Sequence, residues 1–237
     1  MLAASKGLGR ATAAALAAEG ADLAIGARDA STLQATAAAI RAESGRHVVP
    51  IPVDVTDAAQ ARNFVDTALR ELGRIDVLVN NAGGPPFGTF DAFDDDAWRS
   101  AFELNLLSTV RMTRLVLPHL PHDGHGRVIN VISLTVKSVV AGSMLSTAVR
   151  AGVVGMAKLL ADEVAPHGIT VNNVAPGIIL TDRVRQLGGP PVDTLPMRRM
   201  GTPEEFAAVV TFVASAKASY VSGATIPVDG GAIRAIG

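Results

Sequence analysis

The sequence predicts an α/β protein built as a single domain around a doubly wound parallel sheet. Short apolar runs rich in β-branched residues have the length of strands buried on both faces, at residues 22–27, 47–53, 75–80, 127–132 and 169–175. Longer Ala- and Leu-rich stretches of helical character lie between them, at residues 9–19, 31–43, 57–72, 96–118, 146–165 and 203–214. This alternation favours right-handed βαβ units with helices on both faces. The length of 237 residues fits one such unit, residues 1–237.

Residues typical of helix ends support these boundaries. Ser31 and Thr56 are expected to cap the amino ends of two helices, because their side-chain oxygens accept hydrogen bonds from free amides. Gly45 and Gly73 are expected to end the same helices, and Pro203 fits the first turn of the last one.

The composition narrows the classes of partner. Lys and Arg number 21 against 22 Asp and Glu, so the formal charge of −1 gives no broad attraction to nucleic acid or to an anionic membrane. Cysteine is absent, which excludes disulfides, thiolate catalysis and cysteine-ligated metals and fits a reducing, cytoplasmic location. Charges and glycines are expected to divide every apolar stretch before it reaches the length of a membrane span. We therefore expect a small-molecule partner, with no membrane anchor and no metal.

One long segment lacks clear periodicity. Residues 176–202 contain Gly-Gly-Pro-Pro at 188–191 and further prolines, which forbid a long regular element. The segment follows the carboxyl end of a predicted strand, where open α/β sheets bind their ligands. We expect a substrate lid, and a mobile surface loop is the alternative.

A glycine-rich turn lies at the amino terminus. The spacing Ala3-x3-Gly7-x-Gly9 precedes a helix of small residues, an arrangement that lets backbone amides and the helix dipole face a diphosphate. Taken alone, an ordinary glycine-bearing turn explains it about equally well.

Five further motifs follow in order along the chain. They are VNNAGG at 79–84, FELNLLS at 102–108, VINVIS at 128–133, TVNNVAPG at 170–177 and VSGATIPVDGG at 221–231. Together with the glycine turn they resemble the short-chain dehydrogenase/reductase family over essentially the whole length. The resemblance is strongest to the branch of the 3-oxoacyl-acyl-carrier-protein reductases and related NADPH-dependent ketoreductases.

The resemblance implies a role for each matching position. The phosphate cradle would be Ser5, Lys6, Gly7, Leu8 and Gly9. Asp54 would bind the adenine edge with Val55 beside it. The turn formed by Asn81, Ala82 and Gly83 would line the adenosine ribose and also stabilise the sheet. The nicotinamide and its carboxamide would be flanked by Pro176, Gly177, Ile179 and Thr181.

The charge of the residue that follows the second strand of the family's fold indicates which cofactor is bound. NAD-specific sites usually place an acid there, whereas NADP sites need a cation for the 2′-phosphate. Arg28 follows the run at 22–27, no acid occupies Gly26 or Ala27, and Lys6 lies in the adjacent loop. These cations favour NADP, although Arg28 also fits a solvated helix entry.

The family's catalytic set is only half present. Members reduce a carbonyl with an Asn that orders water, a Ser that binds the substrate oxygen, a Tyr that donates a proton and a Lys four residues later. Asn105 and Ser133 match the first two, but Ser146 and Arg150 replace the Tyr and the Lys. A phenol has a pKa of about 10 and an aliphatic hydroxyl is far harder to ionise, so proton transfer is impaired even where hydride geometry survives. Arg150 stays charged and would contact the nicotinamide ribose, but relays protons poorly.

Three interpretations remain open at this point. In the first, the chain is an atypical reductase in which Ser133, Ser146 and Arg150 polarise the carbonyl while water supplies the proton. Lys137 is a weaker candidate for the same role, because a solvent-exposed side chain explains it more simply. Alternatively it is a catalytically silent NADP-binding protein, or a truncated pseudo-enzyme. The resemblance also implies a homo-oligomer, a dimer or more often a tetramer, with contacts through the helices at 96–118 and 146–165.

The amino terminus raises a separate expectation. In this family the first strand is central, and Met1 to Ala3 supply only its last residues, so the first strand is largely missing and the true start is expected upstream. Ala3 also replaces the first glycine of the loop. We expect it to be tolerated only where the backbone avoids positive φ.

Overall fold

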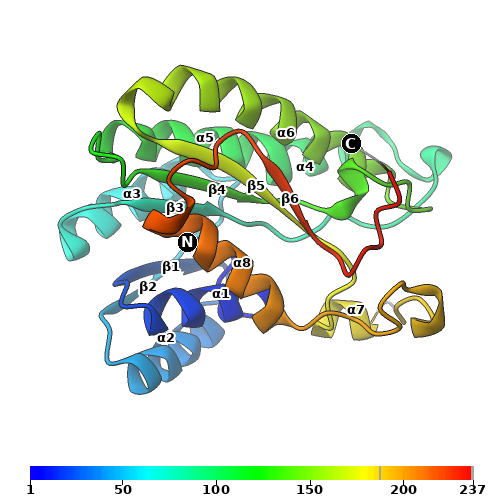
Figure 1. The fold of residues 1–237 in the computed structure, drawn as a ribbon, viewed down its shortest axis with the longest axis horizontal. Coiled ribbons are helices and arrows are strands. Elements are labelled where there is room, and N and C mark those ends of the chain that lie inside the picture. Colours follow the sequence, from blue (N-terminus) through cyan, green and yellow to red (C-terminus); the bar gives the residue numbers. More distant parts are fainter. Residues whose placement is uncertain (187, 236–237) are drawn as a thin grey trace.

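A computed structural model describes residues 1–186 and 188–235 of the chain (Figure 1). The strands in this part are β1 Leu23–Ala27, β2 Val48–Pro52, β3 Val77–Asn80, β4 Arg127–Val131, β5 Thr170–Pro176 and β6 Thr225–Val228. The α-helices are α1 Gly7–Ala18, α2 Ala30–Ser44, α3 Ala58–Leu72, α4 Asp95–Phe102, α5 Ser108–Val116, α6 Met144–Val164, α7 Asp182–Gln186 and α8 Pro203–Ala214.

All strand pairs are parallel, in the orders β1-β2 and β3-β4-β5-β6. Residues 1–4 lie between β1 and β3 and connect the two groups, because the Leu2 amide donates to the Val79 carbonyl at 3.2 Å and the Ala4 amide to the Gly26 carbonyl at 3.1 Å. The amino terminus accordingly lies at the centre of the fold (Figure 1). Residues 1–4 thus occupy the position between β1 and β3 at which the end of the central strand was expected.

Helices cover both faces of this sheet (Figure 1). On one face α1, α2 and α8 bury Leu16, Leu33 and Phe206 against the strands. On the other face α3, α5 and α6 bury a second apolar cluster that includes Phe64 and Met112. Burial on both faces explains why the strands read as continuous apolar runs. The prediction of a doubly wound α/β fold is confirmed.

Two predicted helix caps are wrong by one or two positions. Asp29, and not Ser31, caps α2 by accepting a hydrogen bond from the Thr32 amide at 2.9 Å, and Ser31 itself donates to Asp29. Asp57, and not Thr56, caps α3. In both places a carboxylate lies beside the predicted hydroxyl, and a charged acceptor makes the stronger bond to a helix amino end.

The predicted helix ends are confirmed. Gly45 and Gly73 both adopt the left-handed conformation after α2 and α3. Pro203 begins α8, where Thr202 and Glu205 form a reciprocal capping box.

The helix predicted at 96–118 is divided. A π-helical turn at Glu103–Leu107 separates α4 from α5, and Asn105 lies buried within it. Turns of this kind are frequent at functional sites.

The stretch Met144–His167, made of α6 and the turn after it, is long and apolar enough by length and composition to cross a membrane. It is thus less interrupted by charge than the sequence led us to expect. It packs against β5, and the core helices of globular proteins satisfy the same criterion. The finding is therefore weak evidence for a membrane span.

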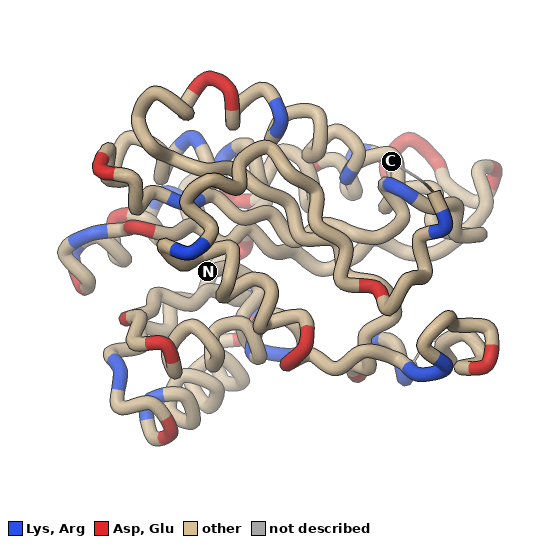
Figure 2. Tube along the Cα trace, in the orientation of Figure 1, with Lys and Arg blue, Asp and Glu red and all other residues tan. Residues whose placement is uncertain are grey.

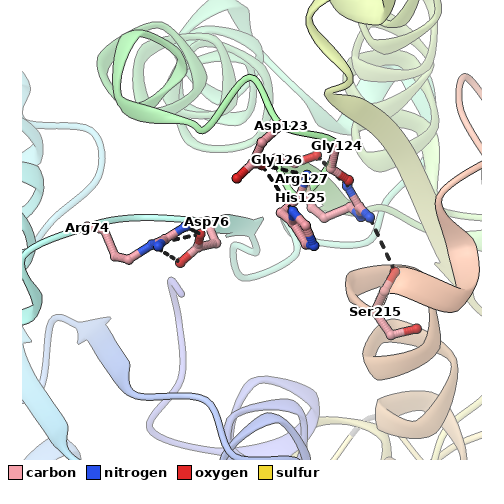
Figure 3. Close-up of polar contacts among 8 residues, drawn as sticks. All are labelled: Arg74, Asp76, Asp123, Gly124, His125, Gly126, Arg127 and Ser215. Atoms are coloured by element: carbon pink, nitrogen blue, oxygen red, sulfur yellow. Dashed lines mark hydrogen bonds and ion pairs between the residues drawn. The ribbon is translucent and has the colours of Figure 1, made fainter.

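Charges of both signs are interspersed along the chain (Figure 2). One cation is buried at the amino edge of the sheet, opposite the edge where ligands are expected. The Nη1 of Arg127 donates to the carbonyls of Gly124 and Gly126, and its Nη2 points to Ser215 at the end of α8 (Figure 3). Arg127 thereby holds the turn before β4 and the end of α8 to the start of the strand.

Candidate functional site

A ladder of polar side chains crosses the sheet from the carboxyl end of β3 to the amino end of β6. Asn80 on β3 donates to Asn130 on β4 at 2.9 Å, and Asn130 donates to Asn173 on β5 at 3.0 Å. Asn173 continues to Thr225 on β6 at 3.2 Å. These four residues are directly paired across neighbouring strands. The ladder joins the four strands β3 to β6 through their side chains, and the sequence prediction did not include it.

The glycine-rich turn is closely packed against residues 1–4. A Cβ atom on Gly9 would lie 2.0 Å from the Ala3 carbonyl oxygen, so no other residue fits there without moving the backbone. Gly7 has a φ of 52°. Helix α1 begins here with no side-chain cap and no acid in its first turn, which leaves its first amides and its dipole available to an anion.

The backbone conformation of Ala3 contradicts the prediction made for this position. Its φ is 48°, in the left-handed region that we expected alanine to avoid. The surrounding contacts explain this conformation, since the Ala3 carbonyl is fixed between Gly9 and the Asn81 amide, whose Nδ2 lies 3.4 Å away. Such strain persists where neighbouring structure over-determines the backbone.

A cavity of about 710 Å³ lies between this turn and the ends of β1, β2 and β3. It is lined by most of the residues predicted to hold the adenosine half of a dinucleotide: Ser5, Lys6, Arg28, Asp54, Val55, Asn81, Ala82 and Gly83. Asp29 and Leu104 also line it, and the sequence prediction missed both. Gly7, Leu8 and Gly9 lie outside this lining, and Leu8 packs against the core.

The charged groups of this cavity are arranged around two carboxylates. Hydrogen bonds from the Thr56 hydroxyl and amide lower the pKa of Asp54, and nearby Arg28 adds to that effect. The Thr32 amide and the Ser31 hydroxyl lower the pKa of Asp29, with Lys6 contributing through its charge. Both acids are therefore ionised at neutral pH and engaged in local bonds, while Arg28 and Lys6 stay exposed and make no ion pair in the described residues.

The predicted catalytic residues occupy the ends of β4, α6 and the π-helical turn. Ser133 follows β4, and its Oγ accepts a bond from the Thr135 amide at 3.3 Å, so its own hydrogen is available to donate. Ser146 is half-buried in the first turn of α6. Asn105 is buried, and neither atom of its amide has a partner within the described residues.

Arg150 is buried one turn after Ser146. Its Nη1 donates to the carbonyls of Val131 at 3.3 Å and Ile132 at 2.5 Å. Burial, with a smaller effect from Arg183, lowers the pKa of Arg150 to about 10, so the group remains charged at neutral pH. It shares a small internal cavity with Asn105 and Asn80.

Known proteins similar to this chain identify the family to which it belongs. The family model described as enoyl-(acyl carrier protein) reductase matches residues 2–232. The chain belongs to the short-chain dehydrogenase/reductase family. It is similar to the short-chain reductase protein NovJ of Streptomyces niveus, at 38% identity over 96% of this chain and 90% of that one. It is also similar to the 3-oxoacyl-[acyl-carrier-protein] reductase FabG of Escherichia coli, at 37% identity over 96% and 93%.

A solved structure extends the comparison to the fold. The L-sorbose reductase of Gluconobacter frateurii, solved with NADPH and L-sorbose, superposes with a TM-score of 0.93 at 28% identity, covering 100% of this chain and 96% of that one. The chain is therefore a FabG-like member of the short-chain dehydrogenase/reductase family, whose members are oxidoreductases.

The predicted catalytic residues include no tyrosine. Tyr220, the chain's single tyrosine, is fully exposed and lies before β6, at the amino edge of the sheet. It lies at the opposite end from Ser133 and Ser146. No tyrosine therefore reaches the site from elsewhere in the fold.

In its described residues, 176–186 and 188–202, the long segment contains no long regular element, as predicted. It holds the short helix α7 and a 3-10 turn at Val192–Thr194. Thr181 lies against Gly7, where a Cβ would be 3.4 Å from its Cγ2. Ile179 is buried and bridged to Gly201, and Pro176 ends β5. Gly177 packs on Asp229 so closely that a Cβ would lie 2.6 Å from its Cα.

Arg183 connects this segment to the loop after β3, and the sequence prediction missed it. Its Nη2 donates to the Pro85 carbonyl at 3.0 Å and lies beside Gly84. The contact ties α7 to the VNNAGG turn across the site. No local pattern marks Arg183, because its partner is 98 residues away in the sequence.

Proposed function

We propose that this protein is an NADP-dependent oxidoreductase that acts on the carbonyl or secondary alcohol of a small molecule, in the manner of the 3-oxoacyl reductases. The observation that carries the proposal is the cavity that joins an uncapped helix amino end to Lys6 and Arg28. A diphosphate fits the amides of residues 5–9, and a 2′-phosphate fits the two cations.

The residues present fit an NADP molecule better than NAD. Asp29 is an acid beside Arg28, but its carboxylate is engaged by the Thr32 amide and the Ser31 hydroxyl. Arg28 has no partner of this kind among the described residues and is free to meet a phosphate. NADPH supplies the hydride when bound. Pro176, Gly177, Ile179 and Thr181 would flank its nicotinamide end.

The catalytic residues are proposed as Asn105, Ser133, Ser146 and Arg150. The Ser133 hydroxyl is free to donate to a substrate oxygen, since its oxygen already accepts from Thr135. Ser146 supplies a second hydroxyl donor, and the Arg150 charge favours a developing negative charge nearby. Water then delivers the proton that a phenol donates in typical family members.

The remaining expectations complete the proposal. The segment at 176–202 acts as a substrate lid held by Arg183, and the protein works in the cytoplasm as a homo-oligomer, a dimer or tetramer. Its contacts run through the helices expected at 96–118 and 146–165. Exposed Leu159 on α6 and Phe102 at the end of α4 support apolar contact surfaces there.

A second candidate is a catalytically silent NADP-binding protein or truncated pseudo-enzyme. The replacement of the proton donor by Ser146 favours it. Steady-state assays distinguish the two: NADPH oxidation is followed with a panel of ketones, quinones and oxoacyl and enoyl thioesters. The reductase proposal expects turnover with at least one substrate that Ser133→Ala abolishes. Retained NADPH binding with no Ser133-dependent turnover would support the silent protein.

A further inference from the structure

Arg183 on α7 extends across the site to the loop that follows β3. Its Nη2 donates to the Pro85 carbonyl oxygen at 3.0 Å and lies beside Gly84. The Nε and Nη1 groups of Arg183 make no hydrogen bond within residues 1–186 and 188–235. Since a guanidinium carries five N–H donors in a planar fork, most of the donors of Arg183 remain available to a ligand.

The loop that Arg183 contacts is bound to the start of α6. The Gly88 amide donates to the Gly142 carbonyl oxygen at 2.8 Å, and Gly88 is bridged to Ser143. Ser143 directly precedes α6, in whose first turn Ser146 lies. The guanidinium of Arg183 is therefore connected, through residues 85–88, to the part of the chain that carries a proposed catalytic hydroxyl.

A second cation, Arg150, lies near Arg183. Arg150 is 7% exposed, and its Nε has no hydrogen-bond partner in the part of the chain that the structure describes. Burial lowers the pKa of Arg150, and the charge of Arg183 lowers it further, so the two guanidinium groups are close enough to repel each other. An anion bound beside them offsets this repulsion.

The acids close to Arg183 are engaged by other groups. Asp182, its neighbour on α7, pairs with Arg185 at 3.1 Å. Asp229, which packs against Gly177 at the start of the same segment, accepts hydrogen bonds from two backbone amides of its own loop. Among the described residues no carboxylate forms an ion pair with Arg183, so its charge is available to a bound anion.

We propose, on the basis of the proposed function, that Arg183 binds a carboxylate of the substrate, and that the preferred substrates are oxo acids or the matching hydroxy acids. The carbonyl or hydroxyl group lies at Ser133 and Ser146, and the carboxylate meets the free N–H groups of Arg183. The planar guanidinium suits the two oxygens of a carboxylate. The carboxylate is unchanged by the reaction, and its role is to orient the substrate.

A phosphate of NADP is the other anion that matches a guanidinium. The proposed cofactor site already provides the amides of residues 5–9 for the diphosphate, and Lys6 and Arg28 for the 2′-phosphate. A carboxylate of the substrate is therefore the anion that we assign to Arg183, and the experiment distinguishes the two sources.

Calorimetric titration of the NADP⁺-saturated protein tests the proposal, because the oxidised cofactor cannot reduce an oxo acid. The probes are 2-oxobutanoate, 3-oxobutanoate and 4-oxopentanoate, each compared with its methyl ester. We expect at least one acid to bind about tenfold more tightly than its ester. Arg183→Met should remove this preference while changing ester binding less than about twofold, and Arg183→Lys, which keeps the charge, should retain part of the preference.

Arg185→Met is the matched control, because Arg185 is a second exposed arginine on α7 but is paired with Asp182. It should leave the preference for the acid unchanged. Equal affinities of acid and ester in wild type, or a preference that survives Arg183→Met, would overturn the proposal. A loss of NADP⁺ affinity in Arg183→Met with the preference kept would assign the guanidinium to the cofactor instead.

The same titrations separate this proposal from the proposed function. If wild type does not bind NADP⁺, the proposed function fails, and the role of Arg183 fails with it. If NADP⁺ binds but no acid is preferred over its ester, the cofactor site is retained and only the assignment of Arg183 is wrong.

Discussion

The Arg150 guanidinium donates to the carbonyl oxygen of Ile132 at 2.5 Å, directly before Ser133. The residue that we propose takes the place of the family's catalytic lysine therefore also holds the backbone at the end of β4. This contact holds the chain from which the Ser133 hydroxyl projects. The Arg150 side chain therefore supplies a positive charge and also supports the end of β4.

Replacing Arg150 by Met should destabilise the protein. The variant leaves the Val131 and Ile132 carbonyls without their donor in a buried place, which costs about 1–3 kcal/mol in the free energy of unfolding. Urea denaturation measures this loss. Arg150→Lys keeps a donor and should lose less; an equal or larger loss for Lys than for Met would show that the carbonyl contact does not matter.

Restoring a phenol should raise turnover. The double variant Ser146→Tyr with Arg150→Lys supplies an acid with a pKa near 10 and an ammonium four residues later, and we expect kcat for a ketone to rise about tenfold or more. The matched control is Ser146→Phe with Arg150→Lys, which adds the ring without the hydroxyl. Equal rates for the Tyr and Phe variants would remove proton donation as the limiting defect.

Two glycine substitutions on helices should act in opposite directions. Gly9→Ala places a Cβ 2.0 Å from the Ala3 carbonyl, so it should lower Tm and weaken NADPH binding. Gly155→Ala on α6 meets no atom within 4 Å and should gain about 0.5–1 kcal/mol from helix propensity. Differential scanning calorimetry measures the thermal stability of both variants. A stabilised Gly9→Ala would be incompatible with the close packing described for the turn.

Acid stability should depend on Glu205. Hydrogen bonds from Arg199, and then from the Thr202 amide, lower the pKa of Glu205 to about 2 from an ordinary 4.5. Because the folded pKa is the lower one, the stabilisation is present above about pH 4.5 and is lost as the pH falls toward 2. The Tm difference between wild type and Glu205→Gln should therefore shrink between these pH values. A difference that stays constant down to pH 2 would exclude this titration as its source.

The sequence was sufficient to predict the fold and most of the residues that line the cavity beside the glycine-rich turn. Continuous apolar runs identify strands buried on both faces, and the carboxyl ends of parallel strands meet at one edge, so Arg28, Asp54 and Asn81 converge as predicted. The motif order places these residues even though they are far apart in the chain.

The features that sequence reasoning missed depend on three-dimensional neighbours. The ladder through Asn130 needs the strand order and the register, which no single segment contains. The positive φ of Ala3 follows from its packing against Gly9, and the contact of Arg183 with Pro85 crosses the site. The prediction of the α2 cap failed for a local reason, because Asp29 accepts hydrogen bonds from both the Thr32 amide and the Ser31 hydroxyl.

Calorimetric titration with NADPH and NADH, on wild type, Arg28→Asp and the surface control Arg70→Asp, tests the central claim most directly. We predict saturable NADPH binding at one site per chain in wild type. Arg28→Asp should weaken NADPH by about tenfold or more while changing NADH far less, and Arg70→Asp should change neither. No binding of either nucleotide, or equal losses of both in Arg28→Asp, would contradict the account.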